Sequence, residues 1–165
     1  MSFKIGHGID IHKLSPNIPL ILGGLTIPSK AGSQGHSDGD VVIHARVDAI
    51  LGALALGDIG TFFPSNNKEY KNADSSIFLE FALKKLKEQK YEINNIDINI
   101  VLETPKLNQY IIEMKKSLCN KINSIQSMRF DMLSIKATTT DKLGFIGSNQ
   151  GIMSTATILI QKNES

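Results

Sequence analysis

The start of the chain alternates between hydrophobic positions and polar or glycine positions. Over residues 3–12, FKIGHGIDIH, this alternation has the period of two that is typical of a half-buried β-strand. The hydrophobic residues of this strand are Phe3, Ile5, Ile9 and Ile11. Side chains two residues apart on a strand point to the same face, so Asp10 and His12 lie together on one face.

A hydrophobic pattern at helical spacing follows a loop rich in glycine and serine. The run VVIHARVDAILGALAL predicts a helix over about residues 40–56, which ends at Gly57 because glycine tolerates a left-handed conformation. The S-x-x-D sequence that begins at Ser37 resembles a helix start, with a side-chain acceptor at the cap and an acid in the first turn. His44 therefore lies near the helix N-terminus, with Asp48 one turn further along the same face.

The same patterns predict the remaining elements and the fold class. A hairpin turns at Gly23-Gly24, and the polar segment 58–76 is expected to be a loop. Strands and helices are interspersed along a chain of 165 residues that is 41% hydrophobic, so we expect one α+β domain over residues 1–165. It has a mixed four-stranded sheet plus a short hairpin, and its helices pack on one face. Beyond the first strand and helix, the elements are the hairpin at 19–28, helices over about 74–90 (capped by Asp74 or Ser75) and 109–122, and strands over about 96–102, 134–140 and 151–162.

Two histidines and one aspartate are candidate metal ligands. The strand supplies Asp10 and His12, the helix supplies His44, and these side chains can converge on one ion. A D-x-H pair alone is more often an exposed polar pair at a strand end, but histidine, aspartate and serine are dense in HSDGD without an evident structural need. Zinc with three protein ligands keeps a coordination position open for substrate, which indicates chemistry more than structural support.

Charge and cysteine content exclude several classes of protein. The net charge of +2, from 18 basic and 16 acidic residues, is far from that of a protein that coats nucleic acid. The lone Cys119 excludes an internal disulfide, fits a reducing compartment and is expected to be buried. Without an apolar signal core or a run of about 20 apolar residues, we expect a cytoplasmic protein with no membrane partner. The cluster Lys84, Lys85, Lys87 and Lys90 is expected to be a solvated helix face.

Two further segments can carry chemistry. In LETPKLN, Lys106 follows a strand end, where its ammonium can meet a polar ligand or can simply be a loop lysine. In KATTTDKLGF, three threonines offer hydroxyl and backbone donors beside Asp141, whose carboxylate suits magnesium, although threonines also favour strands for their shape alone. The glycines of GFIGSNQG match neither a P-loop nor a dinucleotide-binding motif.

Four motifs, in this order, resemble the 2-C-methyl-D-erythritol 2,4-cyclodiphosphate synthase family: GHGIDIHKL, GHSDGDVVIHARVDAILGALALGDIGTFFP, PKL and KATTTDKLGF. The resemblance spans nearly the whole chain. It implies a lyase of the non-mevalonate isoprenoid pathway, which cyclises 4-diphosphocytidyl-2-C-methyl-D-erythritol 2-phosphate to the 2,4-cyclodiphosphate and releases CMP. It also implies a homotrimer with active sites between subunits, each using zinc and a second divalent ion, magnesium or manganese.

The resemblance also implies roles for individual residues. Asp10, His12 and His44 match zinc ligands, and Asp141 matches the magnesium ligand. His36 and Thr139 match residues that stabilise the transition state, and segment 102–108 matches the part of the adjacent subunit that receives cytidine. The expected substrate-binding residues are His36, Ser37, Asp58, Ile59, Gly60, Phe63, Lys106, Leu107, Thr138, Thr139, Thr140, Asp141 and Phe145.

Several positions depart from the family pattern. Ser65 and Asn67 in FPSNN replace the two aspartates of the more usual FPDTD, and Asp141 replaces a glutamate that is one methylene longer. Ser148 and Gln150 replace an arginine and a glutamate near the trimer axis, which argues against isoprenoid diphosphate binding in the central cavity.

Two other functions fit the same residues. A zinc-dependent phosphohydrolase would use the open metal position to activate water and would release inorganic phosphate. A non-catalytic trimeric module would bind nucleotides or a protein partner, with metal serving only stability. Product analysis separates the first alternative from the cyclase, and metal binding without turnover would favour the second.

Overall fold

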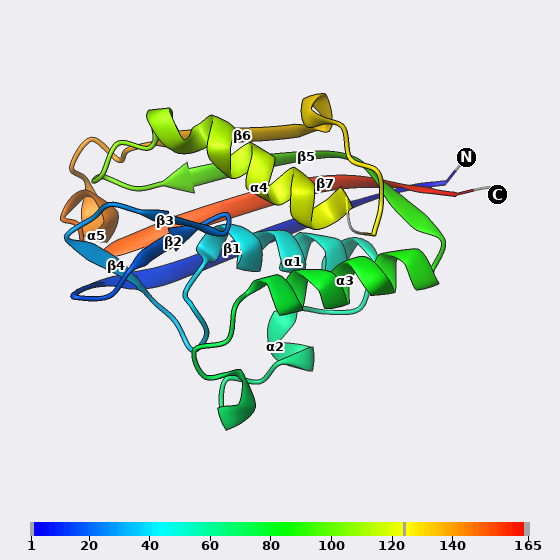
Figure 1. Ribbon diagram of the computed structural model, residues 1–165, viewed down its shortest axis with the longest axis horizontal. Helices are drawn as coiled ribbons and strands as arrows, with labels where there is room; N and C mark the ends of the chain where they lie inside the picture. Colours follow the sequence, from blue (N-terminus) through cyan, green and yellow to red (C-terminus); the bar gives the residue numbers. More distant parts are fainter. Residues whose placement is uncertain (1, 124, 164–165) are drawn as a thin grey trace.

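The computed structural model describes residues 2–123 and 125–163, and its centre is a mixed sheet of five strands. The strand order is β4-β1-β7-β5-β6, and all neighbours are antiparallel except β5 and β6 (Figure 1). A separate hairpin joins β2 and β3. The strands are β1 Phe3–Pro16, β2 Leu20–Leu22, β3 Leu25–Ile27, β4 Ala31–Gln34, β5 Tyr91–Val101, β6 Leu133–Thr138 and β7 Gly151–Lys162.

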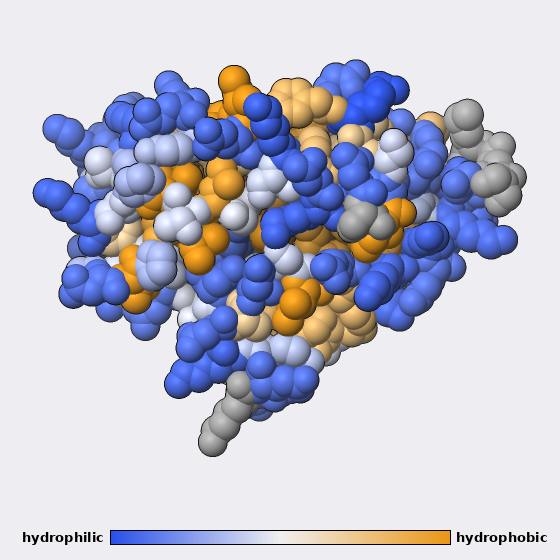
Figure 2. Space-filling view, viewed as in Figure 1, coloured by the Kyte–Doolittle hydropathy of each residue, from blue (hydrophilic) through white to orange (hydrophobic). Residues whose placement is uncertain are grey.

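Three long helices cover one face of the sheet, as the sequence predicts. Helix α1 packs on β1 and β7, α3 on β5 and α4 on β6 (Figure 1). The side that carries the helices is largely hydrophilic, with hydrophobic residues visible between the helices (Figure 2). No helix among the described residues is both long enough and apolar enough to cross a bilayer. The helices are α1 Val41–Ala53, α2 Ile59–Phe62, α3 Ser76–Glu88, α4 Ile111–Asn123 and α5 Gly144–Gly147, with 3-10 turns at Lys68–Tyr70, Asn108–Tyr110 and Phe130–Met132.

The prediction of a four-stranded sheet is wrong, because β4 adds a fifth strand. Its sequence, AGSQ, has no hydrophobic run that would indicate a strand. It forms because β1 continues to Pro16, beyond the predicted strand, and pairs there with β4 from Lys13↔Gln34 to Pro16↔Ala31. The predicted loop 58–76 likewise contains two short helical turns, α2 and Lys68–Tyr70.

Helix α1 begins one residue later than predicted, ends earlier, and is capped by a different side chain. It stops at Ala53 because Ala55, with φ +57°, and Gly57, with φ +90°, take left-handed conformations. The N-cap is Asp40, not Ser37: its Oδ1 accepts from the N–H groups of Val42 and Ile43, each at 3.1 Å.

The Asp40 carboxylate also ties α1 to the hairpin. It accepts from the N–H groups of both turn glycines, Gly23 at 3.0 Å and Gly24 at 2.7 Å. Burial raises the pKa of Asp40, and these backbone donors oppose that shift by stabilising the charged form. One buried carboxylate therefore fixes the hairpin turn and the start of α1 relative to each other.

Helix α1 lies against β1 at backbone contact distance. A Cβ added to Gly6 would lie 1.8 Å from the carbonyl oxygen of Ala49, and a Cβ added to Gly8 would lie 2.0 Å from that of Ala45. Any side chain at either glycine would therefore push the helix away. Glycines on the strand and alanines on the helix set the distance between α1 and β1.

This close contact leaves the hydrophobic side chains of β1 on the opposite face of the sheet. The alternation in the sequence is correct, but its hydrophobic face is the one without helices. Phe3, Ile5, Ile9 and Ile11 are between 50% and 72% exposed in the single chain. A row of this kind along one strand is an unusual surface for a soluble monomer and is typical of an interface.

Arg46 of α1 carries its charge into the core. It is fully buried, and none of its guanidinium nitrogens has a hydrogen-bond partner among the residues that the structure describes. Burial lowers the pKa of Arg46 to about 10, and the negative charge of Asp40 partly opposes this shift. An unpaired charge of this kind costs folding free energy.

We predict that Gly8→Ala lowers the free energy of unfolding by about 1–3 kcal/mol, because the new methyl group overlaps the carbonyl of Ala45. Denaturant unfolding of the metal-free protein measures the change. Gly52→Ala is the matched control: Gly52 lies in α1, and its added Cβ would meet only the His7 carbonyl, at 3.9 Å. The control should be neutral or stabilising by up to about 1 kcal/mol, since alanine favours helices over glycine. Equal effects of the two substitutions would contradict the prediction.

We predict that Arg46→Met raises the free energy of unfolding by roughly 1–4 kcal/mol, because it keeps most of the volume and removes an unpaired buried charge. Arg46→Lys keeps the charge and should not stabilise the fold. The same denaturant titration measures both variants. A methionine variant that unfolds at lower denaturant concentration than the wild type would show that the guanidinium is stabilised.

Candidate active site

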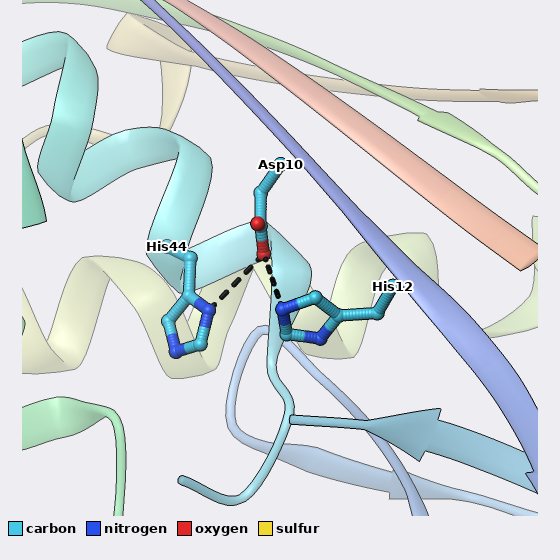
Figure 3. A group of neighbouring side chains, drawn as sticks. All are labelled: Asp10, His12 and His44. Atoms are coloured by element: carbon cyan, nitrogen blue, oxygen red, sulfur yellow. Dashed lines mark hydrogen bonds and ion pairs between the residues drawn. The ribbon is translucent and has the colours of Figure 1, made fainter. Parts of the chain in front are cut away.

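The three predicted metal ligands converge, as the sequence predicts. Strand β1 presents Asp10 and His12 on its helix-covered face, and α1 presents His44 opposite them (Figure 3). Asp10 Oδ2 lies 3.1 Å from His12 Nε2 and 3.1 Å from His44 Nδ1. All three ligand atoms lie within 4.8 Å of one another.

This donor set fits a divalent metal ion. Ligand bonds of about 2.0–2.2 Å place neighbouring donors of a tetrahedral ion about 3–4 Å apart, so the cluster needs little rearrangement. Two imidazoles and one carboxylate leave a fourth position for another ligand. The side chains of Asp10 and His12 are 22% and 14% exposed, so the cluster is open to a small molecule from one side.

The two histidines differ in how firmly they hold a proton. Burial lowers the pKa of His12, which therefore favours the neutral form that binds metals. Burial also lowers the pKa of His44, but the hydrogen bond and negative charge of Asp10 outweigh it, so the net shift is upward. The proton that a metal ion must displace is held mainly by His44.

Three serine hydroxyls support the imidazoles from behind. Ser33 Oγ lies 3.0 Å from His12 Nδ1, while Ser37 Oγ and Ser75 Oγ lie 3.0 Å and 2.9 Å from His44 Nε2. Such partners orient ligating histidines and fix their tautomers. Nothing in the sequence indicated Ser33, and Ser75 was predicted only as a possible helix cap. Ser75 is indeed the N-cap residue of α3, but its hydroxyl makes no capping bond.

The loop with His36 and Ser37 is held against the segment before α3. His36 Nε2 lies 2.9 Å from the carbonyl oxygen of Asn67, and the N–H of Asn72 donates to the His36 carbonyl at 2.9 Å. A pocket of about 340 Å³ adjoins this loop. Its walls include Ser33 and Ser37, so it lies beside both histidines of the cluster.

The GDIG turn is fixed to α1 near the ligands. Asp58 caps α2 by accepting from Thr61, and the N–H of Ile59 donates to Asp48 Oδ1 at 2.7 Å. Burial raises the pKa of Asp48, and the Asp58 and Asp10 carboxylates add to the shift. The role of Asp48 was not predicted, although its position one turn after His44 was. Gly60 lies in the same turn.

Phe63 follows α2 and packs among other aromatic rings. Its ring centroid lies 4.6 Å from that of Phe78, which in turn lies 6.0 Å from the His44 ring. Phe63 thus packs against Phe78, the ring that lies next to His44.

A second group of predicted residues forms another pocket, at the carboxyl ends of β5 and β6. Lys106, Leu107, Thr138 and Thr139 line a pocket of about 270 Å³. Thr140 and Asp141 lie in the turn that follows. The Thr140 hydroxyl donates to the Leu143 carbonyl at 2.7 Å, and Asp141 takes a left-handed conformation with φ +51°.

The three possible metal ligands Asp10, His12 and His44 are called the metal cluster here. Within one chain, the metal cluster and this threonine pocket are separated. The sheet register runs Asp10↔Ser154↔Ile100↔Ala137, which is three strand spacings or about 14 Å. Ile100 and Ser154 between them are fully buried, so no open path crosses the sheet. Phe145 lies in a third pocket of about 430 Å³, which His12 also lines.

Comparisons with known proteins agree with this geometry. The family model described as the YgbB family matches residues 3–161. The chain is 48% identical over 163 residues to 2-C-methyl-D-erythritol 2,4-cyclodiphosphate synthase of Francisella philomiragia, covering 98% of this chain and 100% of that protein. It is 46% identical over 159 residues to the synthase of the same name from Haemophilus ducreyi, covering 96% of this chain and 97% of that protein.

Solved structures show the same fold. IspF of Plasmodium falciparum, in a complex with CDP, matches with a TM-score of 0.85 and 36% identity, covering 99% of this chain and 98% of that one. The bifunctional IspDF of Campylobacter jejuni matches with a TM-score of 0.91 and 37% identity. The match covers 98% of this chain and 42% of that longer protein. These matches confirm the family that the motifs indicated, and the chain belongs to the YgbB family, the family of 2-C-methyl-D-erythritol 2,4-cyclodiphosphate synthases.

Proposed function

We propose that residues 1–165 form one domain that converts 4-diphosphocytidyl-2-C-methyl-D-erythritol 2-phosphate to 2-C-methyl-D-erythritol 2,4-cyclodiphosphate and CMP. The observation that carries the proposal is the convergence of Asp10, His12 and His44 in a chain that matches such synthases over its full length. The reaction belongs to the non-mevalonate isoprenoid pathway. The predicted cytoplasmic location is part of the proposal.

The reaction is an internal phosphoryl transfer that needs no water. An oxygen of the 2-phosphate attacks the β-phosphorus of the diphosphate. The bond from that phosphorus to the oxygen bridging to CMP breaks, and CMP departs with the bonding electrons. Because two anionic groups must approach each other, positioning and charge neutralisation are the main tasks of the site.

The residues present suit two divalent ions. Asp10, His12 and His44 would hold zinc, and the Asp141 carboxylate with the substrate diphosphate would hold magnesium or manganese. Bound there, the ions supply positive charge and orientation for the phosphate oxygens. Magnesium commonly uses only one or two protein carboxylates together with substrate phosphates, which agrees with the single carboxylate of Asp141.

The chain's own donors complete the site. His36, whose Nε2–H donates to the Asn67 carbonyl, would lie beside the oxygens on which negative charge grows in the transition state, and the Thr139 hydroxyl would donate to them. Ser37, Asp58, Ile59, Gly60 and Phe63 would surround the erythritol and its phosphates. Lys106, Leu107, Thr138 and Thr140 would surround the cytidine end, with Phe145 along the substrate path.

The active site is completed by a second subunit in a homotrimer. The metal cluster and the threonine pocket of one chain lie about 14 Å apart across a closed sheet, so one chain alone cannot place both against one reacting diphosphate. The exposed row Phe3, Ile5, Ile9 and Ile11 supplies a hydrophobic face for association. Neighbouring subunits would then bring the metal cluster of one chain to the threonine pocket of the next.

We predict that the wild-type protein with zinc and magnesium releases CMP and a cyclic diphosphate without inorganic phosphate. His44→Ala should lose most of its bound zinc, and its turnover should fall at least about 100-fold. Chromatography of the products and metal analysis of the purified protein measure both effects. Glu80→Ala is the control, since Glu80 is an exposed residue of α3 and belongs neither to the site nor to the proposed association surface. Release of inorganic phosphate would favour a phosphohydrolase, and full turnover by a folded, zinc-free His44→Ala protein would refute the proposal.

We predict that zinc affinity falls as the pH is lowered toward and below the ordinary histidine pKa of about 6.5, because zinc must displace the proton of His44, whose pKa is raised above that value. A raised pKa stabilises the metal-free fold below the unfolded-state value of about 6.5, and this contribution disappears as the pH rises through the folded pKa. Zinc binding stabilises the fold more as the pH rises, so its effect on stability runs opposite to that of the His44 proton. Calorimetry in buffers of different ionisation enthalpy counts the released protons. Constant affinity between about pH 6 and pH 8 would contradict the prediction.

We predict that Ile5→Asp dissociates the assembly, because it places a charge in the most exposed position of the hydrophobic row, which is 72% exposed in the single chain. Sedimentation measures the mass. The monomer should still bind zinc but lose most activity, since the threonine pocket of a neighbour is missing. Lys84→Asp, an exposed position of α3 on the side of the sheet that carries the helices, is the control. A fully active monomer would refute sites between subunits.

A further inference from the structure

The side of His44 that faces away from the metal cluster meets a chain of hydroxyl and carboxylate groups. Ser75 Oγ lies 2.9 Å from His44 Nε2 and also contacts Asp38 Oδ1 at short range. The three residues come from different segments: the loop before α1, helix α1 itself, and the N-terminus of α3. Ser75 is fully buried and His44 is 8% exposed, so water does not replace these contacts.

The direction of the hydrogen bond between Ser75 and Asp38 follows from the groups involved. An ionised Asp38 can only accept, and the Ser75 hydroxyl has a single hydrogen, so Ser75 donates to Asp38. The Ser75 oxygen is then left to accept from His44. Ser75 therefore favours a proton on Nε2 of His44, and once a metal ion displaces the Nδ1 proton that faces Asp10, the lone pair left for the metal is on Nδ1.

Asp38 is itself held in one orientation by backbone donors. Its Oδ1 accepts from the N–H of Asp40 at 3.1 Å, and its Oδ2 accepts from the N–H of Ser75 at 3.1 Å. The Asp38 N–H donates to the Ala73 carbonyl at 3.0 Å. Both carboxylate oxygens are therefore committed as acceptors, and the carboxylate cannot rotate without losing at least one donor.

We propose that Asp38 and Ser75 are positioning residues that hold His44 in the Nε2–H tautomer and so prepare its Nδ1 atom to bind the metal ion. This inference rests on the proposed function, because it requires that Asp10, His12 and His44 bind a divalent metal. Neither residue touches the metal or the substrate. Their effect passes through the imidazole, as in other sites where a hydrogen-bonded carboxylate orients a ligating histidine.

Ser37 has a different place in the same network. Its hydroxyl lies 3.0 Å from His44 Nε2 and 3.2 Å from Ser75 Oγ, but it also lines the pocket of about 340 Å³ beside the loop. It can therefore turn toward a bound molecule while Ser75 still accepts from His44. The structure thus separates a fixed partner, Ser75, from an adjustable one, Ser37.

An asparagine at position 38 cannot replace the aspartate. If its amide nitrogen takes the Oδ2 place, it faces the N–H of Ser75. If it takes the Oδ1 place, it faces the N–H of Asp40 and donates to Ser75, whose hydroxyl then donates to His44 and favours the Nδ1–H tautomer. The first orientation loses the bond from the Ser75 backbone, and the second reverses the Ser75 hydroxyl, so neither keeps all the hydrogen bonds of the aspartate.

The test measures zinc binding and the tautomer of His44 in the full-length protein after chelation and titration with zinc alone. We expect Ser75→Ala and Asp38→Asn to weaken zinc binding by about 10- to 100-fold, in competition with a chromophoric chelator. In the metal-free protein, at a pH high enough for His44 to be neutral, nitrogen-15 NMR should show a larger share of the Nε2–H form in the wild type than in either variant. Ser76→Ala is the matched control, because this neighbouring hydroxyl contacts Lys121 and not His44.

The possible outcomes separate this inference from the proposed function. If the wild type binds zinc and Ser75→Ala binds it equally well with an unchanged His44 spectrum, the positioning role is overturned while the metal site stands. If the wild type does not bind zinc through the three ligands, the metal site fails and the inference fails with it. If Asp38→Asn does not fold, Ser75→Ala alone decides, because it removes only one oxygen atom.

Discussion

The distance between helix α1 and strand β1 is the constraint on which the rest of the structure depends. Gly6 and Gly8 let the helix backbone approach the strand until carbonyl groups fill the space of the missing side chains. This contact places His44 opposite Asp10 and His12, and it turns the hydrophobic side chains of β1 to the other face of the sheet. The metal cluster and the surface for association therefore have one structural cause.

Around this contact, buried polar groups connect segments that are distant in the sequence. Asp40 joins the hairpin turn to α1, Asp48 joins α1 to the GDIG turn, and Asp38 joins the loop before α1 to the start of α3. Each carboxylate accepts from backbone N–H groups, and hydrogen bonds to a charged acceptor are stronger than those between neutral groups. The site is thus built on loops whose positions are determined by three aspartates.

The sequence predicted those features that depend on local periodicity or on side-chain chemistry. The period of two in β1 and the helical spacing around His44 were enough to place the three ligands together. Strand β4 could not be predicted, because AGSQ has no pattern of its own and is a strand only through its pairing with β1. Ser33 and Ser75 were missed as partners of the histidines for a similar reason: each is brought to its imidazole by tertiary packing.

The separation of the metal cluster from the threonine pocket has a genetic consequence under the proposed assembly. A subunit that has lost His44 still carries an intact threonine pocket, and one that has lost Thr139 still carries an intact metal cluster. In hybrid oligomers formed by two such inactive alleles, some interfaces combine the two undamaged halves. Two null alleles of this gene would therefore complement each other in one cell, which two lesions within a single-chain site could not do.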